Sequence, residues 1–178
     1  MRRYADDYEI AYEKDKKGRE KKIAVYKGQY FEVNIDETQL VKFRRICILL
    51  LILVALLHIG GGFVANRGMY LFYVAMPYVI AFLPLYFLSA GILRLPKEKR
   101  KYRRDEVGLT FDRMKKASYS FFVILLAGIL GDIIFLFVLA TEGLWQEYLF
   151  LSIQVLAALG TFIIIRLQKP IEVSASID

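Results

Sequence analysis

Long apolar runs alternate with short polar segments over most of the chain. The first run, residues 46–66, reads ICILLLILVALLHIGGGFVAN and carries no formally charged side chain. At about 1.5 Å of rise per residue, a helix of this length reaches ~31 Å, roughly the thickness of the hydrocarbon core of a bilayer. Three further runs follow at residues 69–93, 117–140 and 144–167. The pattern predicts an all-α integral membrane protein, with residues 37–167 forming a bundle of four transmembrane helices.

Local signals indicate where these helices begin, end and bend. Asp36 precedes the first apolar run, and Gln39 follows it at the spacing of an N-terminal capping box. Gly60-Gly61-Gly62 is expected to end the first helix. Pro77 and Pro84 fall inside the second run, and each removes a backbone donor. We therefore expect two kinks, and the seven-residue separation places both on one side of the helix, so that the bends add.

Small residues recur on the later runs and favour close helix approach. Gly128 and Gly131 lie within one turn before Asp132, so that face of the third helix is expected to point inward. Similar small side chains occur on the second helix, at residues 89–91, and on the fourth, at Ala157, Ala158 and Gly160.

Residues 1–36 are polar and contain three short stretches in which apolar and polar residues alternate. These are residues 8–13, 22–26 and 30–35, separated by turn-forming residues at 15–18 and 27–28. We expect a small cytoplasmic β-meander of three antiparallel strands, with the better signal in the second hairpin, whose short connection contains Gly. Such a sheet has little core of its own and needs support from the membrane surface, the rest of the chain or a partner. The alternative is a charged, mostly disordered tail.

The positive charges lie almost entirely on one side of the predicted bundle. Of the 25 Lys and Arg residues, only Arg67 falls in a connection on the opposite side. By the positive-inside rule, both termini, the connector 94–116 and the tail 168–178 are expected in the cytoplasm of a multi-pass plasma-membrane protein. The opposite connections are short, so the helices are expected to run up-down-up-down.

The connector is the most basic segment of the chain. Its charges border the predicted spans and are expected to face anionic lipid head groups or an acidic protein partner. The chain carries a net charge of +7, but aromatic residues are not interleaved with these charges as in a nucleic-acid-binding module, so no nucleic-acid partner is expected. The connector residues concerned are Arg94, Lys97, Lys99, Arg100, Lys101, Arg103, Arg104, Arg113, Lys115 and Lys116.

Composition supports a membrane protein and excludes sites that need several cysteines. Hydrophobic residues make up 57% of the chain, above the usual ~45–50% of a soluble domain. A single Cys excludes an internal disulfide and a Cys-based metal cluster. The first forty residues are polar and the first apolar run comes late, so no signal-peptide cleavage is expected.

A few polar side chains lie inside the apolar runs, where burial of an ionisable group is costly. His58, Asp132 and Gln154 are expected ~20, ~24 and ~18 Å from the nearest cytoplasmic charges, and Tyr78 reaches a similar depth. We therefore predict one polar intramembrane layer, with the Asp132 carboxylate beside the His58 imidazole and with Gln154 and Tyr78 satisfying the remaining donors and acceptors. Three interpretations are open: the layer fixes helix register, it handles protons or ions with Asp132 as the titrating group, or Asp132 faces a partner helix.

No catalytic motif accompanies these residues. The chain lacks a Gly-rich phosphate loop after a strand and a His-Glu-x-x-His helix. It has a single His and no Ser in a Gly-x-Ser-x-Gly setting, which argues against a Ser-His-Asp triad. We expect no enzyme activity, cofactor or metal. The expected function is that of an accessory or regulatory subunit of a membrane complex; the alternative is a small transporter or channel, forming a homo-oligomer around the polar layer.

Overall fold

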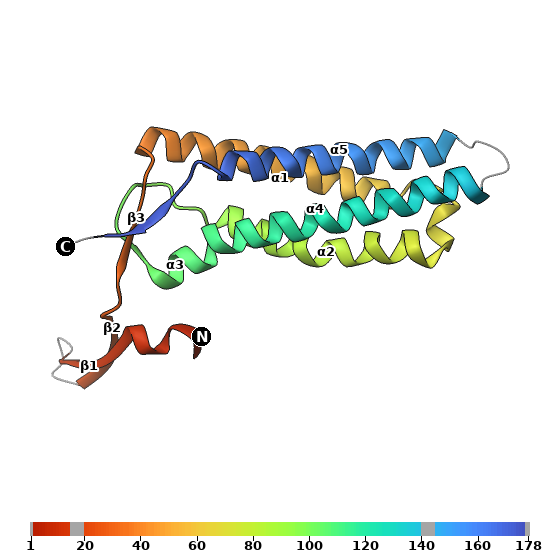
Figure 1. Ribbon diagram of the computed structural model, residues 1–178. Helices are drawn as coiled ribbons and strands as arrows, with labels where there is room; N and C mark the ends of the chain where they lie inside the picture. Colours follow the sequence, from red (N-terminus) through yellow and green to blue (C-terminus); the bar gives the residue numbers. More distant parts are fainter. Residues whose placement is uncertain (1, 15–19, 140–144, 177–178) are drawn as a thin grey trace.

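A computed structural model describes residues 2–14, 20–139 and 145–176 of the chain. Within these residues, four long helices lie side by side, and the short strands gather at one end of the bundle (Figure 1). We call this the strand end; both chain termini lie toward it, and residues 62–71 lie at the opposite, far end. The long helices are α1 (Glu37–Gly61), α2 (Phe72–Leu93), α4 (Phe111–Ile134) and α5 (Trp145–Gln168).

Three helical segments among the described residues are long and apolar enough to cross a membrane. They are Phe72–Leu93, Arg104–Val138 and Trp145–Gln168. The second of these joins α3 (Arg104–Leu109), α4 and most of a π-helical turn, η3 (Phe135–Leu139). These segments indicate a membrane-embedded, multi-pass protein. The four-span arrangement predicted from the sequence remains a prediction for α1.

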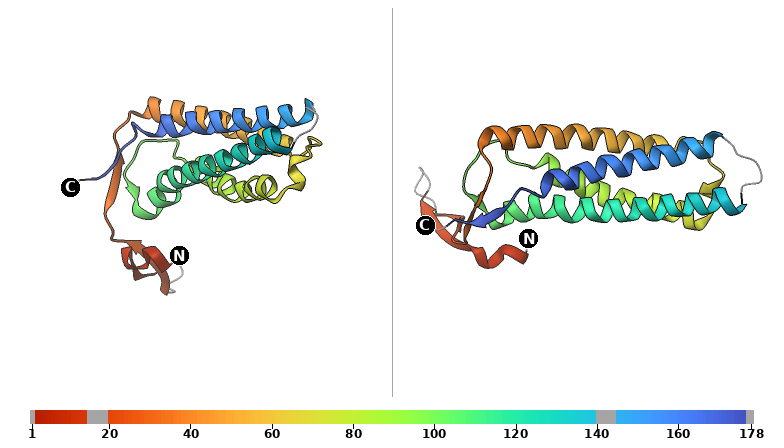
Figure 2. Two further views of the ribbon diagram at one scale, coloured as in Figure 1. Left: turned by 45° about the vertical axis from the view of Figure 1, so that its right-hand side comes forward. Right: turned by 45° about the horizontal axis from the view of Figure 1, so that its top comes forward.

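Each long helix buries one stripe and exposes another. The buried residues of α1 recur at intervals of three and four, as expected for one face of an α-helix; they are Leu40, Phe43, Cys47, Leu51, Val54, His58 and Gly61. This stripe packs on α5, while α4 packs on both α2 and α5. Figure 2 also shows α1 and α5 side by side. The opposite face of α1 exposes large apolar side chains such as Leu49 and Leu56, which suits contact with lipid.

Helices α2 and α4 approach each other closely at Gly131, where α4 has no side chain. An ideal Cβ placed on Gly131 would lie 2.7 Å from the backbone carbonyl oxygen of Tyr73. Pro77, four residues after Tyr73, has no N–H to donate to that carbonyl. Gly131 therefore lies against a backbone oxygen that has lost its helical partner. The prediction that Gly128 and Gly131 point inward is confirmed, because both are buried.

The helix boundaries confirm some of the local signals. Helix α1 begins at Glu37, directly after Asp36, and the Gln39 side chain accepts a hydrogen bond from the Asp36 backbone N–H at 3.3 Å. It ends at Gly61, within the predicted glycine triplet. Both prolines lie inside one continuous helix, α2, so their kinks stay a prediction.

Other helix boundaries differ from the ends of the apolar runs. Residues 62–66 of the first apolar run lie outside helix α1, because the glycine triplet ends it before the apolar run is over. Helix α2 begins at Phe72 rather than residue 69, since a short 3₁₀ turn, η2 (Gly68–Tyr70), precedes it. Helix α4 begins at Phe111, within residues 110–113, where the sequence places the start of the helix that carries the third apolar run. The end of the third apolar run at residue 140, the start of the fourth at residue 144 and the connection between them lie outside the described residues.

The strands form two sheets, so the predicted three-stranded meander is wrong. β1 (Tyr8–Lys14) pairs only with β2 (Glu20–Tyr26) among the described residues, in an antiparallel hairpin; its predicted turn, 15–18, lies outside those residues. β3 (Tyr30–Val33) instead stands between β4 (Tyr102–Arg103) in the connector and β5 (Val173–Ala175) in the tail.

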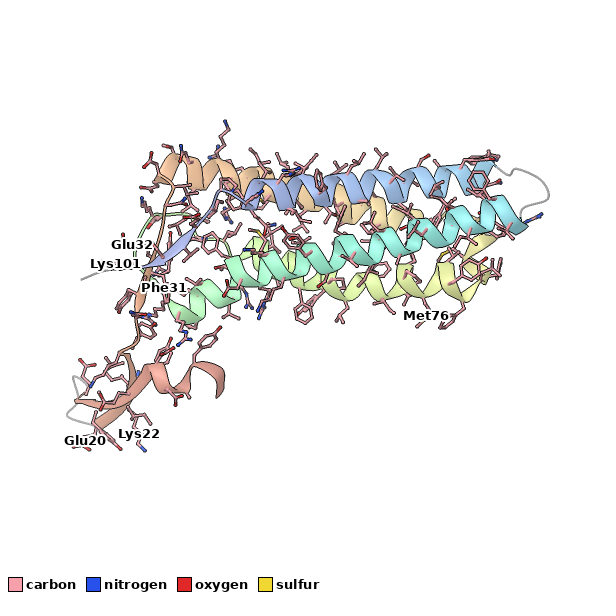
Figure 3. All side chains as sticks on the ribbon, in the orientation of Figure 1. Glu20, Lys22, Phe31, Glu32, Met76 and Lys101 are labelled. Atoms are coloured by element: carbon pink, nitrogen blue, oxygen red, sulfur yellow. The ribbon has the colours of Figure 1, made fainter. Side chains whose placement is uncertain are left out.

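Burial explains why β3 leaves the hairpin. The Val33 side chain is 3% exposed and belongs to the main apolar core, which extends into the helix bundle. A tight β2–β3 turn would hold Val33 with β2, away from that core. The connector and the tail then supply the backbone partners that β3 needs. In Figure 3, Phe31 and Glu32 of β3 lie close to Lys101 at the strand end.

The hairpin β1–β2 stands apart from the bundle. Its Glu20 and Lys22 lie at the extremity of the molecule, well away from the long helices (Figure 3). Hydrogen bonds connect it to the connector: the Tyr8 hydroxyl donates to Asp105 at 3.1 Å, and the Arg104 backbone N–H donates to the Tyr26 hydroxyl at 3.0 Å. The hairpin is thus positioned by the connector rather than by the core.

Candidate functional site

A regular series of polar side chains runs along the buried face of α5. Glu147, Gln154, Thr161 and Gln168 follow one another at seven-residue intervals and are 1%, 2%, 0% and 9% exposed. Seven residues are nearly two helical turns, or about 10.5 Å along the axis, so each lies on the same face as the last. We call this series the α5 polar ladder. Sequence reasoning found only Gln154, although the seven-residue spacing within an apolar run was a usable signal.

At the strand end, the α5 polar ladder makes hydrogen bonds that stabilise the packing of α5. The Gln168 amide donates hydrogen bonds to the Ser118 hydroxyl at 3.2 Å and to the Ile164 carbonyl at 3.1 Å. The Thr161 hydroxyl donates to the Ala157 carbonyl of its own helix at 2.8 Å. These bonds satisfy polar atoms locally and connect α5 to α4 in a fixed register.

His58 lies in an aromatic pocket near the middle of the bundle. Its ring centroid is 4.5 Å from that of Tyr78, 4.6 Å from Phe82 and 5.5 Å from Phe121. The Tyr78 hydroxyl donates to the His58 backbone carbonyl at 2.5 Å, and the imidazole Nε2 has no hydrogen-bond partner among the described residues. The structure thus brings His58 and Tyr78 together. Their contacts involve the His58 backbone carbonyl and the two rings, not a hydrogen bond to His58 Nε2.

Gln154 reaches the same region from α5. Both polar atoms of its amide lack a hydrogen-bond partner within the described ranges, and an ideal Cβ on Gly128 would lie 3.5 Å from the amide nitrogen. On either side of His58 along α1, Gly61 faces Phe150 while Gly160 faces Val54. His58 therefore lies opposite the middle of α5, at about the height of Gln154, and three of the four predicted layer residues share a level.

Asp132 belongs to a different cluster, closer to the far end. It is 0% exposed, and its Oδ1 accepts a 3.5 Å hydrogen bond from the Asn66 amide. Phe121, which contacts His58, precedes Asp132 on α4 by a distance of ~16 Å at 1.5 Å per residue. The predicted pairing of Asp132 with His58 is therefore not formed. The early end of α1 frees residues 62–66, and this loop brings Asn66 to Asp132 instead.

Glu147 completes this group, which we call the acid cluster: Asn66, Asp132 and Glu147. The Asn66 amide donates to Asp132, and the backbone N–H of the next residue, Arg67, donates to Glu147 Oε1 at 2.7 Å, so one loop contacts both carboxylates. Sequence reasoning missed Glu147, since a charged residue at the start of a span suggests the membrane interface.

The acid cluster has unused oxygen atoms. Asp132 Oδ2, Glu147 Oε2 and Asn66 Oδ1 are buried and lack a hydrogen-bond partner among the residues described. Buried oxygen atoms without a partner are costly, so a group that brings a positive charge or a hydrogen-bond donor to them lowers their free energy. The arrangement is chemically suited to taking up and releasing a single positive charge.

No protein-family model, curated protein or solved structure matches this chain. The polar clusters are therefore assigned from their geometry and surroundings. In residues 2–14, 20–139 and 145–176, no three His, Cys, Asp or Glu side chains are grouped so that they could hold a metal ion.

At the strand end, part of the basic connector is engaged within the protein. Arg100 donates to both carboxylate oxygens of Glu106, at 2.7 and 3.2 Å, and the Arg103 backbone N–H donates to Glu106 at 3.0 Å. Partial burial alone would raise the pKa of Glu106, but the hydrogen bonds from Arg100 and Arg103 outweigh it and lower that pKa. The Arg104 guanidinium lies 4.0 Å from Asp7. These arginines hold the connector and the N-terminal segment together.

Proposed function

We propose that this protein is a four-span protein of the plasma membrane and a non-enzymatic accessory or regulatory subunit of a membrane complex. Its strand end would lie in the cytoplasm, because all Lys and Arg residues except Arg67 belong to that side of the chain. Helix α1 would be the fourth span: it packs along α5 and exposes Leu49, Ile52 and Leu56 on its other face.

The projecting hairpin is the observation that carries this proposal. A two-stranded hairpin alone is marginally stable in water. Here the hairpin exposes two large apolar side chains of β1, Ile10 at 64% and Tyr12 at 63%. A membrane protein needs no such element in order to span a bilayer, so we assign it to contact with a protein partner.

The geometry of the hairpin favours one mode of contact. Ile10 and Tyr12 alternate along β1, so they lie on one face, and their cross-strand neighbours on β2 are Ala24 and Lys22. The Lys22 ammonium lies 5.7 Å from the Tyr12 ring centroid, which leaves a positive charge beside the apolar face. We expect a partner surface that combines apolar and acidic side chains.

Affinity purification from native membranes tests this function. A double variant, Ile10→Ser with Tyr12→Ser, removes the apolar face, and a matched double variant, Glu9→Gln with Glu13→Gln, alters the opposite face of the same strand. We expect a partner protein that is retained by the wild type and the matched control and lost from the serine variant. Recovery of the protein alone from the wild-type membranes, or equal retention by all three, would contradict the proposal.

The acid cluster favours a second candidate function, a small transporter or channel that handles protons or ions, as a homo-oligomer. Asn66 Oδ1 is buried without a partner in the described part of the chain and adds a third free oxygen to the two carboxylates. Reconstituted liposomes with a pH-sensitive dye measure this directly. Flux that Asp132→Asn abolishes, and that the exposed Ser152→Ala control leaves intact, would support transport, whereas equal flux in empty liposomes would exclude it.

A further inference from the structure

A groove of about 580 Å³ opens on the side of the bundle between α2 and α4, toward the strand end. Its volume falls within the ~300–1,000 Å³ range of small-molecule sites in proteins. Both helices belong to segments that are long and apolar enough to cross a membrane. A groove on their outer surface therefore opens toward lipid.

The part of the groove nearer the middle of the bundle is apolar. Ile80, Leu83 and Phe87 line it from α2 and are 44%, 61% and 41% exposed, while Ile124 lines it from α4. Pro84 is buried at the groove wall. An acyl chain can lie against these side chains without meeting a polar group other than the Ser120 hydroxyl.

The part of the groove at the strand end is charged. Arg113 and Lys116 line it together with one acid, Asp112, so cations outnumber carboxylates. The Arg113 guanidinium lies 5.9 Å from the Phe87 ring centroid, which places the charge at the boundary with the apolar part. Neither Arg113 nor Lys116 forms an ion pair with a carboxylate in the part of the chain that the structure describes. Two cations are thus available where a lipid phosphate would lie.

The N-terminal segment borders the same groove. Tyr4, in the short 3₁₀ segment η1 (Arg2–Asp7), lines it beside Gly108 of α3. The space next to Gly108 is filled by the Tyr4 ring, and a side chain at position 108 would overlap it. A molecule in the groove would therefore touch the segment that leads into β1.

We propose that this groove binds one anionic phospholipid of the cytoplasmic leaflet. One acyl chain lies along Ile80, Leu83 and Ile124, and the phosphate lies between Arg113 and Lys116. Tyr4 covers the head group, so an occupied groove holds the start of the hairpin segment in place. The assignment to the cytoplasmic leaflet rests on the proposed function, in which the strand end lies in the cytoplasm. The binding of the lipid in this groove does not depend on that orientation.

Native mass spectrometry of the full chain, released from nanodiscs of mixed phosphatidylglycerol and phosphatidylcholine, tests this site. We expect one phosphatidylglycerol molecule to be retained in preference to phosphatidylcholine. Arg113→Gln with Lys116→Gln should weaken the retention of phosphatidylglycerol at least about tenfold, since each basic residue near an anionic lipid contributes to the binding free energy. Lys42→Gln with Arg45→Gln is the matched control, because it removes two exposed charges from the start of α1.

A second variant tests the apolar part without changing charge. Leu83→Trp fills the groove and should also displace the lipid, while leaving Arg113 and Lys116 in place. Because both leaflets of the nanodisc have the same composition, the result does not depend on orientation or on a hairpin partner. Equal retention of the two lipids, an equal loss in the Lys42 and Arg45 control, or displacement of the lipid by millimolar inorganic phosphate would overturn the proposal.

Discussion

Replacing Gly131 with alanine tests the contact between α2 and α4 directly. The new Cβ would lie 2.7 Å from the Tyr73 carbonyl oxygen, 3.3 Å from its carbonyl carbon and 3.4 Å from Cδ2 of its ring. Side-chain carbons essentially never approach other atoms to less than 3.0 Å, and the nearest atoms here are backbone. The two helices must therefore separate by a few tenths of an ångström, because no rotamer change relieves the overlap.

The expected magnitude follows from two opposing effects. Overpacking of this kind costs about 1–3 kcal/mol. Alanine is a better helix former than glycine by up to about 1 kcal/mol. The net expectation for Gly131→Ala is a loss of about 1–2 kcal/mol in the free energy of unfolding, or roughly a 5–30-fold fall in the ratio of folded to unfolded protein.

The chain offers a matched control for this substitution. An ideal Cβ on Gly60 of α1 meets nothing within 4 Å, so Gly60→Ala adds the same methyl group without a collision. Gly160→Ala is intermediate, since its Cβ would lie 2.7 Å from Cγ2 of Val54, a side-chain atom that can move. Unfolding by sodium dodecyl sulfate in mixed micelles measures all three. Equal stability of Gly131→Ala and Gly60→Ala would show that α2 and α4 are not in backbone contact at Tyr73.

Two further changes probe the strand end. The pKa of Glu106 is lowered in the folded protein, so its hydrogen bonds to Arg100 and Arg103 stabilise the connector above the ordinary value of about 4.5 and are lost as the pH falls through the lowered pKa. Hydrogen-exchange protection at β4 and α3, taken relative to the intrinsic exchange rate at each pH, should fall in the wild type on acidification. It should be low at pH 7 in Glu106→Gln, but not in the exposed control Glu98→Gln. Unchanged protection in Glu106→Gln would refute the role of this carboxylate. Ser118→Ala removes one hydrogen-bond partner of the Gln168 amide and should lower the free energy of unfolding by about 0.5–1.5 kcal/mol in the same micelle assay. Ser152→Ala, on an exposed face, is the control and should leave that free energy unchanged. Equal effects of the two substitutions would exclude the Ser118–Gln168 hydrogen bond as a stabilising contact.

The helices could be predicted from the sequence because their signals are local. The length of an apolar run can be counted directly in the sequence, and the residues that begin and end α1 lie next to it in the chain. The glycines of α4 were expected to face inward because they precede the one acid in that run. None of these inferences needs knowledge of a distant segment.

The errors concern contacts between distant segments. The Phe31–Tyr102 and Val33–Val173 pairs of β3 join residues far apart in the sequence, and nothing within β3 specifies these neighbours. The partner of Asp132 depends on how residues 62–66 fold back after α1 ends. Counting residues from the nearest charges placed Asp132 at the height of His58, whereas the structure places it closer to the far end, and the count could not show that Asn66 would occupy the adjacent space.

The position of β5 has a consequence for the order of synthesis. β5 follows α5 in the chain, so the three-stranded sheet cannot be completed until the last long helix has left the ribosome. Until then, β3 has β4 on one side and an unpaired backbone edge on the other. β5 can therefore pair with β3 only after all four long helices have been synthesised, so the complete sheet forms only in a chain that already has the whole bundle.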